Sequence, residues 1–219
     1  FTILSGMTGT GKTEIIQALP TGLDLEGAAN HKGSSFGRPL DEQPAQIDFE
    51  NRIAIDLLKV EDQHPQSMVV LEDESRNIGA RHIPHYFADR MAASQFVVIE
   101  MDFEERLERL WQEYVVERYL KTMAFFGATG EQEFASYLRE SLLRVQKRLG
   151  GQRTKELLAS MDAAIEVQHG DNFASHRDWL AGITRDYYDP MYSYQLKKKK
   201  ELVVFRGPRE EVVEWLQRG

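Results

Sequence analysis

A glycine-rich loop at the start of the chain restricts the fold more than any other feature of the sequence. Five apolar or small residues, Phe1–Ser5, run directly into the segment Gly6-Met7-Thr8-Gly9-Thr10-Gly11-Lys12-Thr13, and a helix-forming stretch follows. A strand, a turn with glycines at this spacing, a Lys-Thr pair and a helix form the pattern of a phosphate-binding loop. The alternative, a glycine-rich turn of no special function, leaves the lysine and threonine at these offsets unexplained.

Each residue type in this loop has a role in holding phosphate. The glycines let the backbone curl, so that several N–H groups converge on one phosphate at the positive end of the new helix. Lys12 adds a positive charge for the outer phosphate, and the Thr13 hydroxyl is a ligand for Mg²⁺. We therefore predict a phosphate site formed by Gly6, Thr8, Gly9, Thr10, Gly11, Lys12 and Thr13.

The composition excludes several other classes of protein. The 219 residues, 42% hydrophobic and 28% charged, suffice for one α/β domain with a helical insertion. Cysteine is absent, which excludes disulfides, thiolate metal sites and a thiol nucleophile within the chain. No apolar run has the length of a membrane span and no signal peptide precedes the first strand, so we expect a cytoplasmic protein without a membrane partner. The chain starts on a strand residue without an initiator Met, so we expect an excised domain or one whose N-terminal part is missing.

Short β-rich runs alternate with helical patterns, which predicts a parallel sheet covered on both faces. The runs are Phe1–Leu4, Leu23–Leu25, Met68–Leu71, Phe96–Ile99 and Leu202–Phe205. We expect a P-loop NTPase-like three-layer α/β/α fold with a central parallel sheet of about five strands. One of the helices is predicted over Ile47–Val60, with a buried stripe of Ile47, Ala54, Leu57 and Leu58.

An all-helical insertion interrupts this α/β core. We predict core residues 1–102 and 189–219, and an insertion over 103–188 that serves as a lid or as a substrate platform. Glycines that break its helices are predicted at Gly127, Gly130, Gly150, Gly151 and Gly170. Within it, Met123, Phe125 and Phe126 line an apolar ligand channel in one interpretation and belong to an ordinary core in the other.

In open parallel sheets the active site lies beyond the carboxyl ends of the strands. Glu26 and a polar loop with His31, Lys32, Ser34, Ser35 and Arg38 follow the second strand, and we take these five loop residues as candidates for substrate contacts. The third strand ends in Glu72-Asp73-Glu74, the arrangement of a Walker B element. We predict a Mg²⁺ site formed by Thr13, Glu72 and Asp73, without choosing between the two acids.

Positive side chains near these strand ends have two interpretations each. Arg76 and Arg81 are candidates for neutralising a leaving diphosphate and for substrate contacts, or they form surface ion pairs. With Lys12, Glu72 and Asp73, Arg76 completes our predicted catalytic set. The run Lys197–Lys200 is either a solvated approach to the last strand or a grip on a polyanion. The net charge of −8 argues against broad non-specific binding of nucleic acid.

Four longer motifs resemble one family closely. They are Ala29–Gly37, Gln43–Asn51, Leu71–Gly79 and Tyr187–Tyr192, so together with the loop the resemblance spans nearly the whole chain. The family is the C-terminal P-loop domain of tRNA 2-selenouridine synthase. The resemblance implies a preceding rhodanese domain with an essential cysteine, which this sequence lacks, so the selenation step is not expected of this chain alone.

The same resemblance implies a chemistry and a set of partners. The wobble 2-thiouridine of certain tRNAs is first S-geranylated from geranyl diphosphate, and the S-geranyl group is then displaced with selenophosphate. Lys12, Mg²⁺ and nearby arginines would stabilise the leaving diphosphate. Two alternatives stay open: a nucleotide-dependent kinase or ATPase, which the same loop supports, and a non-catalytic tRNA-binding module.

Overall fold

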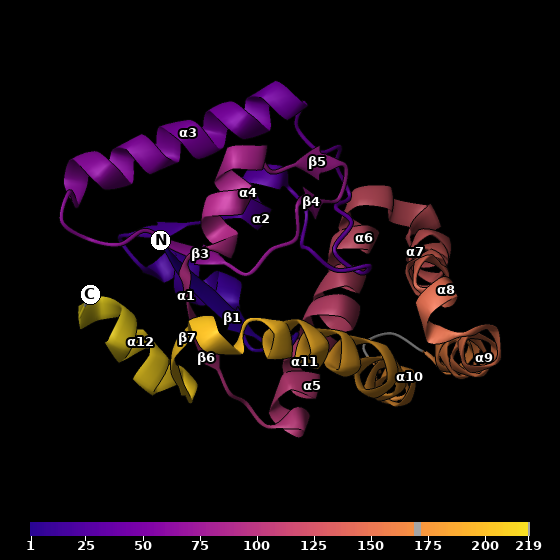
Figure 1. The fold of residues 1–219 in the computed structure, drawn as a ribbon. Coiled ribbons are helices and arrows are strands. Elements are labelled where there is room, and N and C mark those ends of the chain that lie inside the picture. The colour runs from indigo at the N-terminus through magenta and orange to yellow at the C-terminus, as the bar shows by residue number, and fades with distance from the viewer. Residues whose placement is uncertain (169–171, 219) are drawn as a thin grey trace. The chain divides into compact units, whose positions relative to one another are not determined.

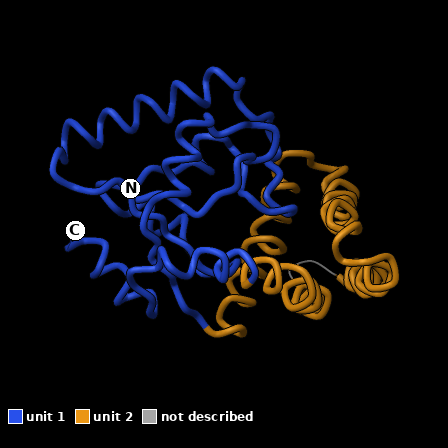
Figure 2. Tube along the Cα trace, in the orientation of Figure 1, with its two compact units in different colours: residues 1–101, 194–219 blue, residues 102–193 orange. Residues whose placement is uncertain are grey.

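The structure is a computed structural model that describes residues 1–168 and 172–218. It divides into two compact units, coloured separately in Figure 2. The first, which we call the sheet unit, comprises Phe1–Met101 and Tyr194–Gly219; the second, the helical unit, comprises Asp102–Ser193. The second boundary falls inside helix α11 (Asp189–Lys198), five residues beyond the expected end of the insertion at residue 188.

The sheet unit contains the predicted parallel sheet (Figure 1). Its strands are β1 (Thr2–Gly6), β2 (Gly22–Leu23), β3 (Val70–Glu72), β6 (Gln95–Ile99) and β7 (Val203–Gly207), in the order β2-β3-β1-β6-β7. All of their pairings are parallel. The prediction of a P-loop-like α/β/α fold with about five strands is confirmed. A small antiparallel hairpin, β4 (Asn77–Ile78) and β5 (Arg81–His82), was not expected.

Helices cover both faces of this sheet because alternate strand residues point to opposite sides. Ile3, Leu71 and Phe96 pack with residues of α2 (Leu25–Ala29), α3 (Gln46–Gln63) and α4 (His85–Ala92). Their neighbours Leu4, Val70 and Val97 pack with residues of α1 (Lys12–Ala18) and α12 (Arg209–Arg218). The result is the three-layer arrangement, with β1 in the centre of the sheet and the phosphate loop at its end.

The predicted buried stripe of α3 was wrong for three of its four residues, whereas Leu57 is half-buried and packs against the core. Ile47 is 60% exposed and Leu58 is 63% exposed, and Ala54 is also exposed. The buried residues are Phe49, Ile53 and Val60, on the opposite face of the helix. Both sets have helical spacing, so periodicity identified the helix and did not decide which of its two apolar faces meets the sheet.

The helical unit contains helices and no strand among its described residues. They are α5 (Phe103–Trp111), η1 (Gln112–Glu117), α6 (Arg118–Phe126), η2 (Gly127–Thr129), α7 (Gly130–Arg144), α8 (Gln146–Leu149), α9 (Gly151–Val167), α10 (His176–Ile183), η3 (Thr184–Tyr188) and the first part of α11. Helices begin or end at Gly127, Gly130 and Gly150-Gly151, as predicted, whereas Gly170 lies outside the described residues.

A polar cluster lies in the interior of the helical unit. His176 and Trp179 are fully buried, and the Trp179 indole N–H donates to Nδ1 of His176 at 2.9 Å. The other ring nitrogen lies 2.8 Å from Oε1 of Gln168. A bidentate ion pair of Arg106 with Asp189, at 2.9 and 2.8 Å, ties α5 to α11 in the same unit. Among the described residues, no helix has the length and apolar character required to cross a membrane.

Candidate phosphate-binding site

The phosphate loop connects β1 to α1 in a conformation that requires its glycines. Gly9 and Gly11 have φ of 83° and 74°, a region that residues with a side chain rarely adopt. Thr10 is fully buried, and its hydroxyl donates to the carbonyl of Met7 at 2.9 Å, which closes the turn. The Lys12 ammonium lies across the loop, 3.4 Å from the carbonyl oxygens of Gly6 and Met7. The lysine is therefore held at the concave side of the turn, where a phosphate group would lie.

An arginine from the end of the chain supports this loop, and the sequence analysis missed it. Arg209, the first residue of α12, donates to the carbonyl of Gly11 at 3.1 Å and pairs with Glu14 at 3.0 Å. Almost 200 residues separate these partners, and no local pattern connects them. The Pro208-Arg209 pair marks the start of the last helix but does not indicate its contact with the loop.

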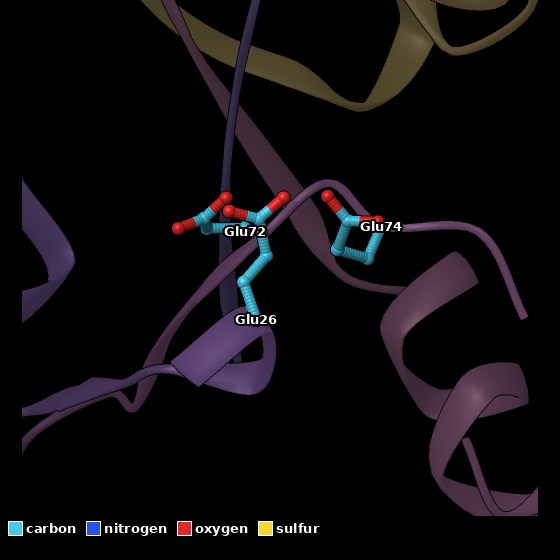
Figure 3. Close-up of side chains that lie close together, drawn as sticks. All are labelled: Glu26, Glu72 and Glu74. Atoms are coloured by element: carbon cyan, nitrogen blue, oxygen red, sulfur yellow. The ribbon is translucent and has the colours of Figure 1, made fainter. Parts of the chain in front are cut away.

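Three glutamates gather beside the loop (Figure 3). Glu72 is the last residue of β3, Glu74 follows two residues later, and Glu26 is in the first turn of α2. One carboxylate oxygen from each side chain lies within 4.8 Å of the other two. Because parallel strands end at the same edge of a sheet, β2 and β3 bring acids 46 residues apart in sequence to one place.

The loop residues that surround these acids fix the orientation of their carboxylates. The Thr13 hydroxyl donates to Oε2 of Glu26 at 3.2 Å, and the backbone N–H of Gly33 donates to Oε1 of the same side chain. A Cβ on Gly33 would lie 2.5 Å from Oε2 of Glu74, so a larger residue here would displace that carboxylate. The polar loop after α2 therefore brings the backbone of Gly33 directly against the acids.

The electrostatics of the cluster favour the protonated forms of Glu72 and Glu74 when no cation is present. Burial, followed by the charge of Glu26, raises the pKa of Glu72 to about 8. Burial also raises the pKa of Glu74 well above its ordinary value, and the carboxylates of Glu26 and Glu72 add to the increase. Lys12 opposes both shifts because its positive charge favours the ionised acids. A cation in the cluster would act in the same direction as Lys12.

Asp73, the other acid of the expected Mg²⁺ site, has different partners. Its Oδ2 accepts a hydrogen bond from the Ser5 hydroxyl at 2.7 Å, and its Oδ1 pairs with the Lys199 ammonium. Asp73 and Lys199 are only 12% and 27% exposed. One member of the lysine run is thus a structural partner of the Walker B segment, while Lys200 forms a surface pair with Glu201.

Gln43 joins three of the recognised motifs through backbone hydrogen bonds. Its amide nitrogen donates to the carbonyl oxygens of Ala29 and Ile78, at 2.8 and 3.1 Å, and its amide oxygen accepts the N–H of Ala80 at 2.7 Å. Gly79, at φ +61°, is required here because a Cβ would lie 2.3 Å from the same amide oxygen. The glutamine therefore holds the end of α2, the β4–β5 hairpin and the start of α3 in one arrangement.

The residues predicted to contact substrate or tRNA lie in two segments of the sheet unit. The loop between α2 and α3 carries His31, Lys32, Ser34, Ser35 and Arg38, and the region of the β4–β5 hairpin carries Arg76 and Arg81. Lys32 and Arg38 are exposed. Arg76 pairs with Asp89 at 2.9 Å, and both side chains are more than half exposed. This contact agrees with the interpretation of Arg76 as part of a surface ion pair. Arg81 is half-buried, with its Nε atom enclosed.

The aromatic residues considered as an apolar channel lie on α6 of the helical unit. Phe125 and Phe126 are 56% and 37% exposed and contact each other edge to face, with ring centroids 4.9 Å apart. They are therefore not part of an ordinary core, and Met123 beside them is half-buried.

Comparison with known proteins identifies the family. The family model described as the tRNA 2-selenouridine synthase AAA domain matches residues 1–219. Proteins named tRNA 2-selenouridine synthase from Salmonella newport (strain SL254), Salmonella agona (strain SL483) and Salmonella heidelberg (strain SL476) are each 43% identical over 217 residues. The match covers 98% of this chain and 60% of each relative, so the chain spans about three-fifths of the length of these proteins. No solved structure matches the chain.

The family match agrees with the site that the fold builds. A phosphate loop, an acidic strand end and the motif loops occur together in one sheet unit, in a chain that the family model covers from end to end. The chain belongs to the tRNA 2-selenouridine synthase AAA domain family.

Proposed function

We propose that this domain binds geranyl diphosphate and supports S-geranylation of the wobble 2-thiouridine in tRNA, before the exchange of sulfur for selenium with selenophosphate. The observation that carries the proposal is the phosphate loop with its adjacent acids in a member of this family. The full reaction also needs the rhodanese domain that we expect in the longer protein, because the chain has no cysteine of its own.

The proposed transfer is a displacement with a defined electron balance. The thiocarbonyl sulfur forms the new C–S bond, and the C–O bond to the diphosphate breaks with its electron pair on the leaving group. The proton on N3 of the uracil ring leaves to a base as sulfur is alkylated. The task of the site is to hold the diphosphate and to stabilise its developing charge, which Lys12 and the loop backbone can do.

A divalent cation completes this electrostatic task in the proposal. Mg²⁺ supplies positive charge to phosphate oxygens and has oxygen ligands, which Thr13 and the nearby glutamates offer. The buried oxygen Oε1 of Glu72 has no hydrogen-bond partner among the described residues, so the residues present fit a cation. Arg209 would keep the loop in shape from its outer side.

The test is a transfer assay with tRNA that contains 2-thiouridine. The domain is incubated with this tRNA, geranyl diphosphate and Mg²⁺, and the nucleosides are then analysed by mass spectrometry. We expect a geranylated 2-thiouridine whose yield Lys12→Ala reduces by about tenfold or more, because a charged partner of the leaving group is lost. Lys59→Ala, which removes an exposed lysine of α3, is the matched control and should not change the yield.

The same assay separates the proposal from nucleotide hydrolysis, which the loop also supports. ATP replaces geranyl diphosphate, and phosphate release is followed with both lysine variants. ATP turnover that depends on Lys12, together with absence of any geranylated nucleoside, would overturn the proposal in favour of an ATPase. Binding of tRNA alone, with a steep loss of affinity as salt rises, would instead support a tRNA-binding module.

A further inference from the structure

We propose that Glu26, Glu72 and Glu74 form a carboxylate cage that binds one hard divalent cation in the absence of any phosphate ligand, so that the cation binds first and the phosphate ligand second. The cage itself depends only on the geometry of the sheet unit. The order of binding rests on the proposed function, because it concerns the diphosphate.

The spacing of the three carboxylates suits a single ion. Oxygen ligands lie roughly 2.0–2.6 Å from Mg²⁺ or Ca²⁺, so two ligands on opposite sides of one ion are about 4–5 Å apart. One oxygen from each glutamate lies within 4.8 Å of the others. The three side chains come from α2, from the end of β3 and from the segment after it, so the ion would join these elements (Figure 3).

Glu72 supplies an independent sign that something is bound there. Its side chain is 1% exposed, and its Oε1 atom lacks a hydrogen-bond partner in the described part of the chain. A buried carboxylate oxygen without a partner is costly in free energy, and native proteins rarely retain one without a ligand or a function. A cation in the cage removes this cost directly.

The surroundings hold the ligands in place before a cation arrives. Glu26 receives hydrogen bonds from Thr13 and from the backbone of Gly33, one on each of its carboxylate oxygens. The backbone of Gly33 also lies against the carboxylate of Glu74. Partners of this kind orient the ligands of a metal and lower the entropy cost of binding.

The number of carboxylates implies the order of binding. Proteins usually hold Mg²⁺ at phosphate sites with one or two carboxylates, and the phosphates bring the remaining ligands. Three carboxylates are enough to bind a cation without that help. A diphosphate that arrived first would add negative charge beside these carboxylates with no cation to offset it, so we expect the cation to bind first.

The oxygen-only ligand set selects the class of cation. Carboxylate and hydroxyl oxygens suit Mg²⁺, Mn²⁺ and Ca²⁺, whereas Zn²⁺ and Cu²⁺ prefer nitrogen or sulfur ligands. Mn²⁺ is a useful probe because the free ion has an electron paramagnetic resonance signal that weakens on binding. Mg²⁺ is then measured by its competition with Mn²⁺.

The experiment titrates the chain with Mn²⁺ alone, without diphosphate or nucleotide. We expect one site per chain, with affinity reduced about tenfold or more in Glu26→Gln and in Glu72→Gln, since each loses a charged ligand. The matched control is Glu61→Gln, which removes an exposed acid of α3 and should leave the affinity unchanged. Circular dichroism spectra of all variants verify that the fold is retained.

Two outcomes distinguish this inference from the proposed function. If Mn²⁺ binds only when diphosphate is present, or if Glu26→Gln binds it as tightly as the original chain, the cage is overturned and the proposed function is untouched. If Mn²⁺ binds alone and geranyl diphosphate does not bind at all, the cage stands and the proposed function fails. Both binding alone and dependence on Glu26 and Glu72 are required to support the cage.

Discussion

At the scale of single residues, the ionised form of Glu72 is unfavourable for the stability of the fold. The end of a buried strand is a poor environment for a negative charge, and a second glutamate lies beside it. A shift of the pKa of Glu72 from 4.5 to about 8 corresponds to a few kcal/mol between its two protonation states. Such a cost is typical of residues kept for function rather than for stability.

The raised pKa of Glu72 predicts how stability depends on pH in the absence of metal. The folded state binds the proton more tightly than the unfolded state, so the stabilisation is complete below pH 4.5 and is lost as the pH rises towards 8. We expect Glu72→Gln to unfold at a higher temperature than the original chain at pH 9, with a smaller difference at pH 5. Thermal unfolding measured in chelator tests this. Equal differences at both pH values would show that Glu72 does not titrate in this range.

The lowered pKa of His176 predicts the opposite dependence of stability on pH in the helical unit. Burial lowers its pKa to about 4, and Nδ1 accepts the Trp179 hydrogen bond, so the ring is neutral with its proton on Nε2. The stabilisation is complete above pH 6.5 and is lost as the pH falls towards 4. An NMR titration of the imidazole should give a midpoint near pH 4. A midpoint near 6.5 would mean that the ring is accessible to water.

At the scale of elements, Lys199, the residue after α11, pairs with Asp73, the residue after β3. The run Lys197–Lys200 is exposed or half-buried, and only Lys199 is paired with an acid of the Walker B segment. Its pair with Asp73 is mostly buried, and Ser5 of β1 completes the network. This arrangement assigns different roles to lysines that are indistinguishable in the sequence.

The Lys199–Asp73 pair predicts that substitutions within the lysine run differ in their effect on the free energy of unfolding. Lys199→Ala should lower the free energy of unfolding by about 1–3 kcal/mol, between the values for exposed and fully buried pairs. Lys197→Ala and Lys200→Ala should change it by less than about 0.5 kcal/mol, as surface substitutions usually do. Urea unfolding of the three variants makes the comparison. A loss of similar size in all three would rule out a special role for Lys199.

The position of Gly33 in the loop after α2 predicts how a substitution there changes cation binding by the cage. In Gly33→Ala the new methyl group meets the carboxylate of Glu74, which must move. We expect Mn²⁺ affinity to fall several-fold with little change in stability, because the far end of a flexible side chain can shift. Gly151→Ala has open space around its Cβ position and serves as the control. Unchanged Mn²⁺ affinity in Gly33→Ala would place Glu74 outside the cage.

At the scale of the whole molecule, the parts that could be predicted are those encoded locally. The alternation of short β-rich runs with helices predicted the parallel sheet, and the phosphate loop is contiguous in sequence. The face of α3 that is buried could not be predicted, because Ile47 and Leu58 follow the helical period as well as Phe49 and Ile53 do. Only the folded chain distinguishes two such faces.

The remainder of the site could not be predicted because distant segments build it. Glu26 joins Glu72 and Glu74 only when β2 pairs with β3, and Arg209 reaches the loop from the last helix. The sequence did not distinguish Asp73 from Glu72, but successive strand-end residues point in different directions, so the two acids have different partners. The family motifs were recognisable, yet the function of Gln43 as a backbone brace emerges only from its hydrogen bonds.

The most direct test of the account is a calorimetric titration of the domain with geranyl diphosphate in the presence of Mg²⁺. We predict saturable binding at one site, weakened about tenfold or more by Lys12→Ala and unaffected by Lys59→Ala, because Lys12 lies across the phosphate loop whereas Lys59 pairs with Asp56 on α3. Absence of saturable binding by the folded domain, or equal affinity in the original chain and Lys12→Ala, would contradict the claim that this loop holds the diphosphate.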